Sequence, residues 1–215
     1  MLLMREKWTG MLPVALVVVF ALTRWPGLMP LNFSAAYALA FCAGVYFPRR
    51  LAWWLPLGAL LLSDLALNLY YFSVLHIDAF KPTQVFNYVA FALIIRLGRG
   101  FNSRSSLMKL LGGGMLGAFL FYLVTNTAAW AFNPFQNPEY TKNFGGWIVA
   151  LTKGTAGYPQ TWEFFRNTLL SGGLFTGLFA GAMKLCEGAE KAASSEEEAE
   201  ERAGVEEGVT EESKA

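Results

Sequence analysis

Six apolar segments follow one another along this 215-residue chain, and they restrict its fold more than any other feature. A helix that crosses a bilayer needs about 17–25 mostly apolar residues. Segments of this kind occupy about 8–25, 33–48, 50–72, 83–98, 107–130 and 163–186. The first follows Arg5 and Lys7 as in a signal peptide but lacks a convincing cleavage site, so we expect it to be retained. The sequence predicts an all-α bundle of six transmembrane helices over residues 1–186.

The charges divide the chain into a basic, apolar body and an acidic tail. Residues 187–215 hold eleven glutamates against three basic residues, a net charge of −8, whereas residues 1–186 carry +9. Charged residues make up only 15% of the chain, against about 25% in a typical soluble domain. The tail has too few apolar residues to offset the entropy of ordering. We therefore predict a membrane domain over 1–186 and a disordered tail, or at most a fraying helix, over 187–215, either solvated or binding a partner.

The distribution of Lys and Arg gives the predicted bundle an orientation. With the N-terminus in the cytoplasm, nine basic residues fall on the cytoplasmic side and five on the opposite side. The nine are Arg5, Lys7, Arg49, Arg50, Arg96, Arg99, Arg104, Lys109 and Lys184, and the five are Arg24, Lys81, Lys142, Lys153 and Arg166. We therefore expect a multi-pass protein of the bacterial inner membrane with both termini cytoplasmic and the long 131–162 loop outside.

The long loop contains one amphipathic stretch. Phe144, Trp147, Ile148 and Leu151 recur at helical spacing. The Asn-Pro pairs before this stretch disfavour helix, so the loop should turn first and then form a short helix at the membrane interface. That helix would be either a connector resting on the surface or a lid over an external site.

Asp64 lies inside the most apolar of the six segments, within "LPLGALLLSDLALNLYY". An ionisable side chain at the bilayer centre costs about 2.5–3.5 kcal/mol on insertion scales, so it usually faces a protein interior or a wet cavity. In the predicted orientation, hydrogen-bonding residues of other segments lie at the same outer depth. We therefore expect an outward-facing pocket for a small molecule. Its candidate ligand-binding residues are Asp64, Asn68, Tyr122, Asn126, Trp130, Trp162 and Arg166.

In that pocket Asp64 would accept hydrogen bonds or face a cation, and Arg166 would face an anion. Structural roles would explain the same residues. Asp64 would then pair with Arg166 or accept a hydrogen bond from Asn126 and lock the bundle. Trp130 and Trp162 at helix ends are typical of the aromatic belt at a membrane interface.

Small residues at four-residue spacing indicate close helix packing. The last apolar segment has Gly173, Gly177 and Gly181, the fifth has Gly113 and Gly117, and the second has Ala36, Ala40 and Gly44. These faces pack helices within the chain or dock a separate membrane subunit.

Several chemistries have no support in the sequence. It has no Walker A, HExxH or G-x-S-x-G motif and no catalytic dyad, so we expect no ATP hydrolysis and no enzyme activity. One histidine, His76, and two distant cysteines, Cys42 and Cys186, suggest no metal site, and we expect no cofactor and no nucleic-acid partner.

Four stretches carry a resemblance to known membrane proteins. They are "NFSAAYALAFCAGVYF", "LLLSDLALNLYY", "FYLVTNTAAW" and "GYPQTWEFF". Over about 30–186 the chain resembles a bacterial family of uncharacterised membrane proteins to which transport is ascribed. That family is similar in layout to the S-components, the substrate-capture subunits of energy-coupling factor (ECF) transporters. The matching residues are Asn32, Phe33, Ser34, Ser63, Asp64, Thr125, Asn126, Tyr158 and Pro159.

The resemblance implies a six-helix protein with cytoplasmic termini that binds a small nutrient from outside, beneath its loops. A separate transmembrane coupling subunit with two ATPases would supply the work. S-components typically dock that subunit through an Ala-x-x-x-Ala element on the first helix, where this chain has only Ala15 and Ala21. The histidine-bearing N-terminus of the cobalt and nickel branch is absent, which argues against metal uptake.

We therefore predict an S-component-like transport protein that captures a small organic solute from the external side. The alternative is a structural or assembly subunit of a larger membrane complex, which would pack through its glycine faces and recruit a partner with its tail.

Overall fold

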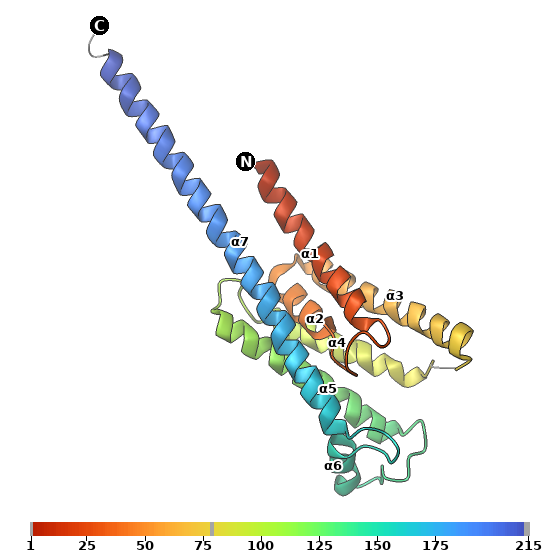
Figure 1. Ribbon diagram of the computed structural model, residues 1–215. Helices are drawn as coiled ribbons and strands as arrows, with labels where there is room; N and C mark the ends of the chain where they lie inside the picture. Colours follow the sequence, from red (N-terminus) through yellow and green to blue (C-terminus); the bar gives the residue numbers. More distant parts are fainter. Residues whose placement is uncertain (1, 78–79, 213–215) are drawn as a thin grey trace.

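The computed structural model describes residues 2–77 and 80–212, and everything described in it is helix or connection. The helices form one elongated bundle (Figure 1). In chain order they are α1 (Leu2–Arg24), α2 (Ala36–Tyr46), α3 (Arg49–Leu75), the 3₁₀ turn η1 (Pro82–Gln84), α4 (Val85–Gly98), α5 (Leu107–Phe132), α6 (Phe144–Thr152) and α7 (Thr161–Glu212). The predicted all-α class is confirmed.

Each of the six predicted segments is helical, but not all of them have the length of a membrane span. In the described part of the chain, three helices are long and apolar enough to cross a membrane: α3, α5 and the 161–195 part of α7. These three helices indicate a membrane protein. By contrast, α2 has 11 residues and α4 has 14. At about 1.5 Å per residue neither reaches the roughly 30 Å of a hydrocarbon core.

The helices alternate in direction, so the connections gather at two opposite ends of the bundle (Figure 1). At one end, here called the loop end, α1, α3 and α5 finish and α2, α4 and α7 begin, and α6 lies beside them. At the opposite end, the terminal end, the first turns of α1 and the last turns of α7 extend beyond the other helices. The hydrogen-bonding residues singled out in the sequence belong mainly to the loop end.

Helix α2 is the centre of the bundle. Residues 35–43 are buried without interruption, and α2 packs against α1, α3, α4, α5 and α7. Its approach to α4 is a contact between backbones, because a Cβ on Gly44 would lie 2.5 Å from the Ile95 carbonyl oxygen. A Cβ on Gly98 would overlap the Phe41 carbonyl oxygen in the same way. Glycine at both positions therefore sets the distance between α2 and α4.

The contact between α5 and α7 also relies on small residues. A Cβ on Gly114 would overlap Thr176, and a Cβ on Gly172 would lie 2.6 Å from the Ala118 methyl group. The predicted glycine zipper of α7 is used only in part. Gly173 and Gly177 face side chains of α5, but a Cβ on Gly181 would meet nothing within 4 Å.

The loop between α5 and α7 contains the predicted short helix. α6 begins at Phe144, where the Asn143 side chain accepts a hydrogen bond from the Gly146 N–H at 2.9 Å. On its inner side, the Trp147 indole donates to the Thr127 hydroxyl of α5 at 3.0 Å, while Phe144 is 72% exposed. The predicted short helix is confirmed, but its predicted apolar face is not the buried one, since Phe144 and Ile148 are exposed while Gly146 and Ala150 are buried.

The acidic tail differs from the prediction. Residues 187–212, expected to be disordered or a fraying helix, continue α7 as helix to Glu212. Alanine, glutamate and lysine have high intrinsic helix propensity, and no proline interrupts the segment. The low apolar content that suggested disorder prevents burial in a core but does not prevent an exposed helix.

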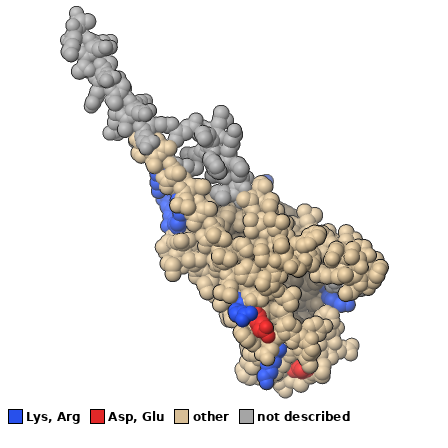
Figure 2. Space-filling model, viewed as in Figure 1, with Lys and Arg blue, Asp and Glu red and all other residues tan. Residues whose placement is uncertain are grey.

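The outer surface of the bundle is largely uncharged. On the face drawn in Figure 2, Lys, Arg, Asp and Glu occupy small separate areas of the described surface. Helix α3 shows this most clearly, since Leu62, Leu69 and Phe72 are each more than 65% exposed. An exposed apolar stripe of this length is the surface that a helix presents to lipid.

Candidate functional site

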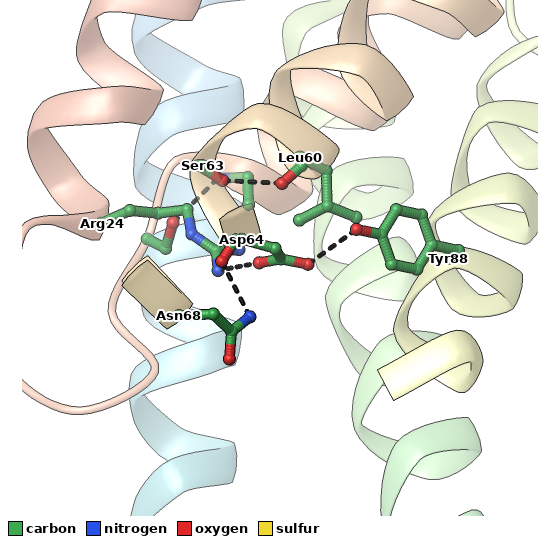
Figure 3. A network of polar contacts seen from close by, with 8 residues as sticks. Arg24, Leu60, Ser63, Asp64, Asn68 and Tyr88 are labelled. Carbon is green, nitrogen blue, oxygen red and sulfur yellow. Dashed lines mark hydrogen bonds and ion pairs between the residues drawn. The ribbon is translucent and has the colours of Figure 1, made fainter. Parts of the chain in front are cut away.

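Asp64 is the centre of a polar cluster formed by three helices at the loop end (Figure 3). Arg24, the last residue of α1, donates from Nη2 to Asp64 Oδ1 at 2.5 Å, and the Tyr88 hydroxyl of α4 donates to Oδ2 at 2.9 Å. The side chains of Arg24 and Asp64 are 23% and 13% exposed. Asn68 donates from its amide to the Asp64 backbone carbonyl at 2.8 Å, one turn back along α3. The carboxylate therefore has a partner for each oxygen.

The sequence-based pairing of Asp64 was wrong. The structural alternative named Arg166 or Asn126 as its partner, and the structure gives Arg24 and Tyr88 instead. Arg166 lies over the ring of Trp162 at 5.6 Å, and Asn126 donates to the Tyr122 carbonyl of its own helix at 2.8 Å. The long Arg24 side chain lets a residue at a helix end reach the carboxylate of a neighbouring helix.

The other predicted site residues hold the loop between α5 and α7 in place. This segment, residues 133–160, is called the cap segment below. The Tyr122 hydroxyl donates to the Leu151 carbonyl of α6, and the Trp130 indole donates to the Thr141 carbonyl at 2.8 Å. Trp162 donates to the Gln160 side chain at 2.7 Å. Each of these three polar groups is therefore engaged by the protein itself.

A cavity of about 380 Å³ lies beside the Asp64 cluster. Arg24, Asn32, Ser34, Tyr71 and Asn87 contribute polar groups to its wall, and Phe33, Tyr37, Phe91 and Phe121 contribute aromatic rings. Two of the polar groups support the start of α2. The Thr23 hydroxyl accepts from the Ala35 N–H at 3.0 Å, and the Ser34 hydroxyl accepts from the Ala36 N–H at 3.2 Å.

A larger cavity of about 680 Å³ lies between the start of α4, the end of α5 and the cap segment. Its lining residues are Lys81, Thr83, Gln84, Asn87, Thr125, Ala128, Ala129, Pro134, Phe135, Asn137, Tyr140, Thr155 and Tyr158. Asn87 lines both cavities. The larger volume lies within the range of about 300–1,000 Å³ that is usual for small-molecule sites.

Several polar groups on the wall of the larger cavity are unused. Within the described residues, the side chains of Asn87, Tyr140 and Tyr158 form no hydrogen bond, whereas the Thr125 hydroxyl donates to the Phe121 carbonyl at 2.9 Å. Burial raises the pKa of Tyr140, and the neighbouring Glu139 carboxylate raises it further. Tyr140 therefore stays protonated and can donate a hydrogen bond.

Glu139 fastens the two halves of the cap segment to each other. The Ala156 N–H donates to its Oε1 at 3.0 Å, and this hydrogen bond holds the pKa of the carboxyl below its ordinary value of 4.5. Glu139 does not line the larger cavity. This hydrogen bond joins the part of the cap segment that holds Asn137 and Tyr140 to the part that holds Thr155 and Tyr158.

The chain matches one protein family along most of its length. Residues 5–195 match DUF6580, a family of unknown function. The chain belongs to this family. No curated protein and no solved structure matches it. Membership in the family therefore assigns no activity.

The seven predicted site residues lie at the loop end, but none of them lines either cavity. Instead, their sequence neighbours do. Thr125 precedes Asn126, and Asn87 precedes Tyr88. One residue along a helix turns a side chain by about 100°, which is enough to move it from a cavity to a helix contact. Thr125 and Tyr158 were already among the residues that carry the family resemblance.

In the described residues, no three His, Cys, Asp or Glu side chains lie close enough together to hold a metal ion. The polar groups of the larger cavity are hydroxyls, amides and one ammonium. This set can hydrogen-bond to a small organic molecule and hold it in one orientation.

Proposed function

We propose that this chain is a solute-capturing membrane protein of the S-component type, which binds a small organic molecule in the larger cavity at the loop end. The observation that carries the proposal is a cavity of about 680 Å³ whose wall includes unused hydrogen-bonding groups. Of these groups, the side chains of Asn87 and Tyr140 are half-buried, and half-buried groups without a hydrogen-bond partner lose free energy unless a ligand or water satisfies them. A small molecule with hydroxyl, amide or acid groups would satisfy them.

The proposed orientation of the protein in the membrane follows from its basic residues. Arg49, Arg50, Arg99, Arg104 and Lys109 all belong to the connections and helix starts of the terminal end. By the positive-inside rule this end would face the cytoplasm of a bacterial inner membrane. The termini would then be cytoplasmic, and the two cavities would open toward the external side, where a solute arrives.

The cap segment suggests how the solute would be retained. It supplies six of the lining residues of the larger cavity: Pro134, Phe135, Asn137, Tyr140, Thr155 and Tyr158. It is fastened to α5 at Trp130 and Tyr122, so it can cover a ligand without being detached from the bundle. Release into the cytoplasm would require a partner, and a transmembrane coupling subunit with ATPases has the required chemistry.

The proposal is tested by the small molecules that the protein retains. The full chain, purified in a mild detergent, is extracted and its small molecules are identified by mass spectrometry, together with those of the variants Thr125→Val and Asn87→Leu. Ser73→Ala is the matched control, because Ser73 is exposed and its hydroxyl only donates to the Leu69 carbonyl of its own helix at 2.6 Å. All four proteins are first checked for a single symmetric peak in size-exclusion chromatography.

We expect the wild type and Ser73→Ala to retain the same molecule and the two cavity variants to retain at least about tenfold less, which corresponds to the loss of a single well-placed hydrogen bond of about 1.4 kcal/mol. Equal retention in all four proteins would show that the retained molecule does not bind in the larger cavity. A wild type that retains nothing above an unrelated membrane protein would reject solute capture itself.

A further inference from the structure

The wall of the larger cavity carries a charge of one sign only. Among its lining residues, Lys81 is the single ionisable group that is charged at neutral pH, and no carboxylate lines the cavity. Lys81 is half-buried at the start of η1, and its ammonium lies 5.9 Å from the centre of the Phe135 ring. It forms no ion pair in the described part of the chain, where Arg24–Asp64 is the one ion pair.

Two carboxylates of the described residues, those of Asp64 and Glu139, lie at the same end of the bundle as Lys81. Asp64 accepts from Arg24 and Tyr88 and does not line the larger cavity. Glu139 accepts the Ala156 N–H with Oε1, its buried Oε2 has no hydrogen-bond partner, and the residue does not line the cavity. Among the residues that the structure describes, neither carboxylate forms an ion pair with Lys81. A half-buried ammonium without a counter-charge is costly, and its cost falls when an anion binds.

The remaining wall is suited to the rest of such a molecule. Phe135, Tyr140 and Tyr158 offer ring faces, and Ala128 with Ala129 of α5 forms an apolar floor. Asn87 and Thr125 add an amide and a hydroxyl on the helix side. A flat molecule with an acidic group at one end would place that group on Lys81 and its ring against the aromatic side chains.

We infer that the solute captured in the larger cavity is a small organic anion, whose carboxylate or phosphate group binds Lys81. This inference rests on the proposed function and specifies its substrate class. The two anionic groups share the same chemistry toward an ammonium, so the probes must separate them.

The test uses the full chain in detergent and measures both retained molecules and thermal shifts. The variants are Lys81→Gln, Lys81→Arg and, as the matched control, Lys153→Gln, which neutralises an exposed lysine at the same end that lines neither cavity. The thermal-shift probes are benzoate, its neutral counterpart benzamide, and inorganic phosphate. Retained molecules are identified by mass spectrometry and classed by charge.

We expect the molecules retained by the wild type and by Lys153→Gln to be anions. Retention should fall at least about tenfold in Lys81→Gln, the loss expected for one hydrogen bond to a charged group, and return in Lys81→Arg. Benzoate should raise the melting temperature of the wild type more than benzamide does, and Lys81→Gln should abolish that difference. If inorganic phosphate raises the melting temperature and Lys81→Gln removes that effect, the solute carries a phosphate group. If benzoate raises the melting temperature and inorganic phosphate does not, the solute carries a carboxylate.

The ways in which the test can fail are distinct. If the wild type retains a neutral or cationic molecule, or if Lys81→Gln retains the same anion at the same level, the anion inference is wrong and solute capture stands. If the wild type retains no small molecule, both the proposed function and this inference are rejected.

Discussion

The Arg24–Asp64 pair allows a double-mutant cycle whose outcome the structure predicts. Arg24→Met leaves the Asp64 carboxylate with only the Tyr88 hydroxyl, and Asp64→Leu leaves the Arg24 guanidinium without a counter-charge. Removing one partner of a fully buried ion pair costs about 3–5 kcal/mol. Here the side chains are 23% and 13% exposed, so solvent screens part of that cost. We expect about 2 kcal/mol for each single variant.

The double variant removes both charges and leaves only the neutral Tyr88 hydroxyl without its acceptor. Replacing both members of an ion pair by apolar side chains is often close to neutral, so the double variant should lose about 1 kcal/mol or less. For a chain of this size, 1 kcal/mol corresponds to about 2–4 °C in melting temperature. Each single variant should therefore melt about 4–8 °C lower than wild type, and the double variant less than about 4 °C lower.

The assay is thermal unfolding of the detergent-solubilised protein, followed by the fluorescence of its seven tryptophans. Arg166→Met is the matched control, because it removes an exposed arginine that lies over Trp162 and forms no ion pair in the described chain. Its melting temperature should change by about 1–2 °C at most. If the losses of the two single variants simply add in the double variant, the pair is not coupled and the reasoning about Asp64 is wrong.

Three further outcomes follow from the structure. Gly44→Ala and Gly98→Ala should each destabilise the bundle by about 1–3 kcal/mol, because the added methyl group would meet the backbone of the facing helix, whereas Gly181→Ala should leave the melting temperature unchanged or higher. The Ala156 amide should be protected from hydrogen exchange while Glu139 is ionised. Because the pKa of Glu139 in the folded protein is lowered from 4.5, this stabilisation is complete above pH 4.5 and is lost as the pH falls through the lowered pKa. Glu139→Gln should remove this pH dependence. Tyr122→Phe should lower stability by about 1 kcal/mol and increase hydrogen exchange in α6, because the Leu151 carbonyl loses its donor; unchanged exchange in α6 would contradict the anchoring role of Tyr122.

The positions of the helices could be predicted from the sequence because apolar length and flanking charge are local properties. The ends of α4, predicted at 83 and 98, lie at Val85 and Gly98. The short helix α6 was predicted for the same reason. The predicted span at α2 is not confirmed, since this helix has 11 residues and a run of apolar residues does not distinguish a lipid-facing helix from one enclosed by other helices.

The seven residues predicted for the candidate site lie at the loop end but line neither cavity. The sequence placed Asp64 among polar neighbours, but its partner Arg24 lies 40 residues earlier in the chain, on α1. The residues of α1 alone do not show how this helix is rotated about its axis. At the Gly44–Gly98 contact α4 meets α2 backbone to backbone, and in this packing Asn87 lines the cavities while Tyr88 donates to Asp64. A backbone contact of this kind depends on two segments at once, so it cannot be inferred from either segment alone.

The position of α2 has a consequence for how the chain is made. The helix leaves the ribosome early, but two of the helices that enclose it, α5 and α7, come much later in the sequence. Until then the sides of α2 that α5 and α7 cover have no partners, and its 11 residues are too few to hold a transmembrane position alone. For most of the synthesis of the chain, α2 is therefore only partly covered by other helices. The stage most exposed to degradation and misassembly is thus the interval between the synthesis of α2 and that of α7.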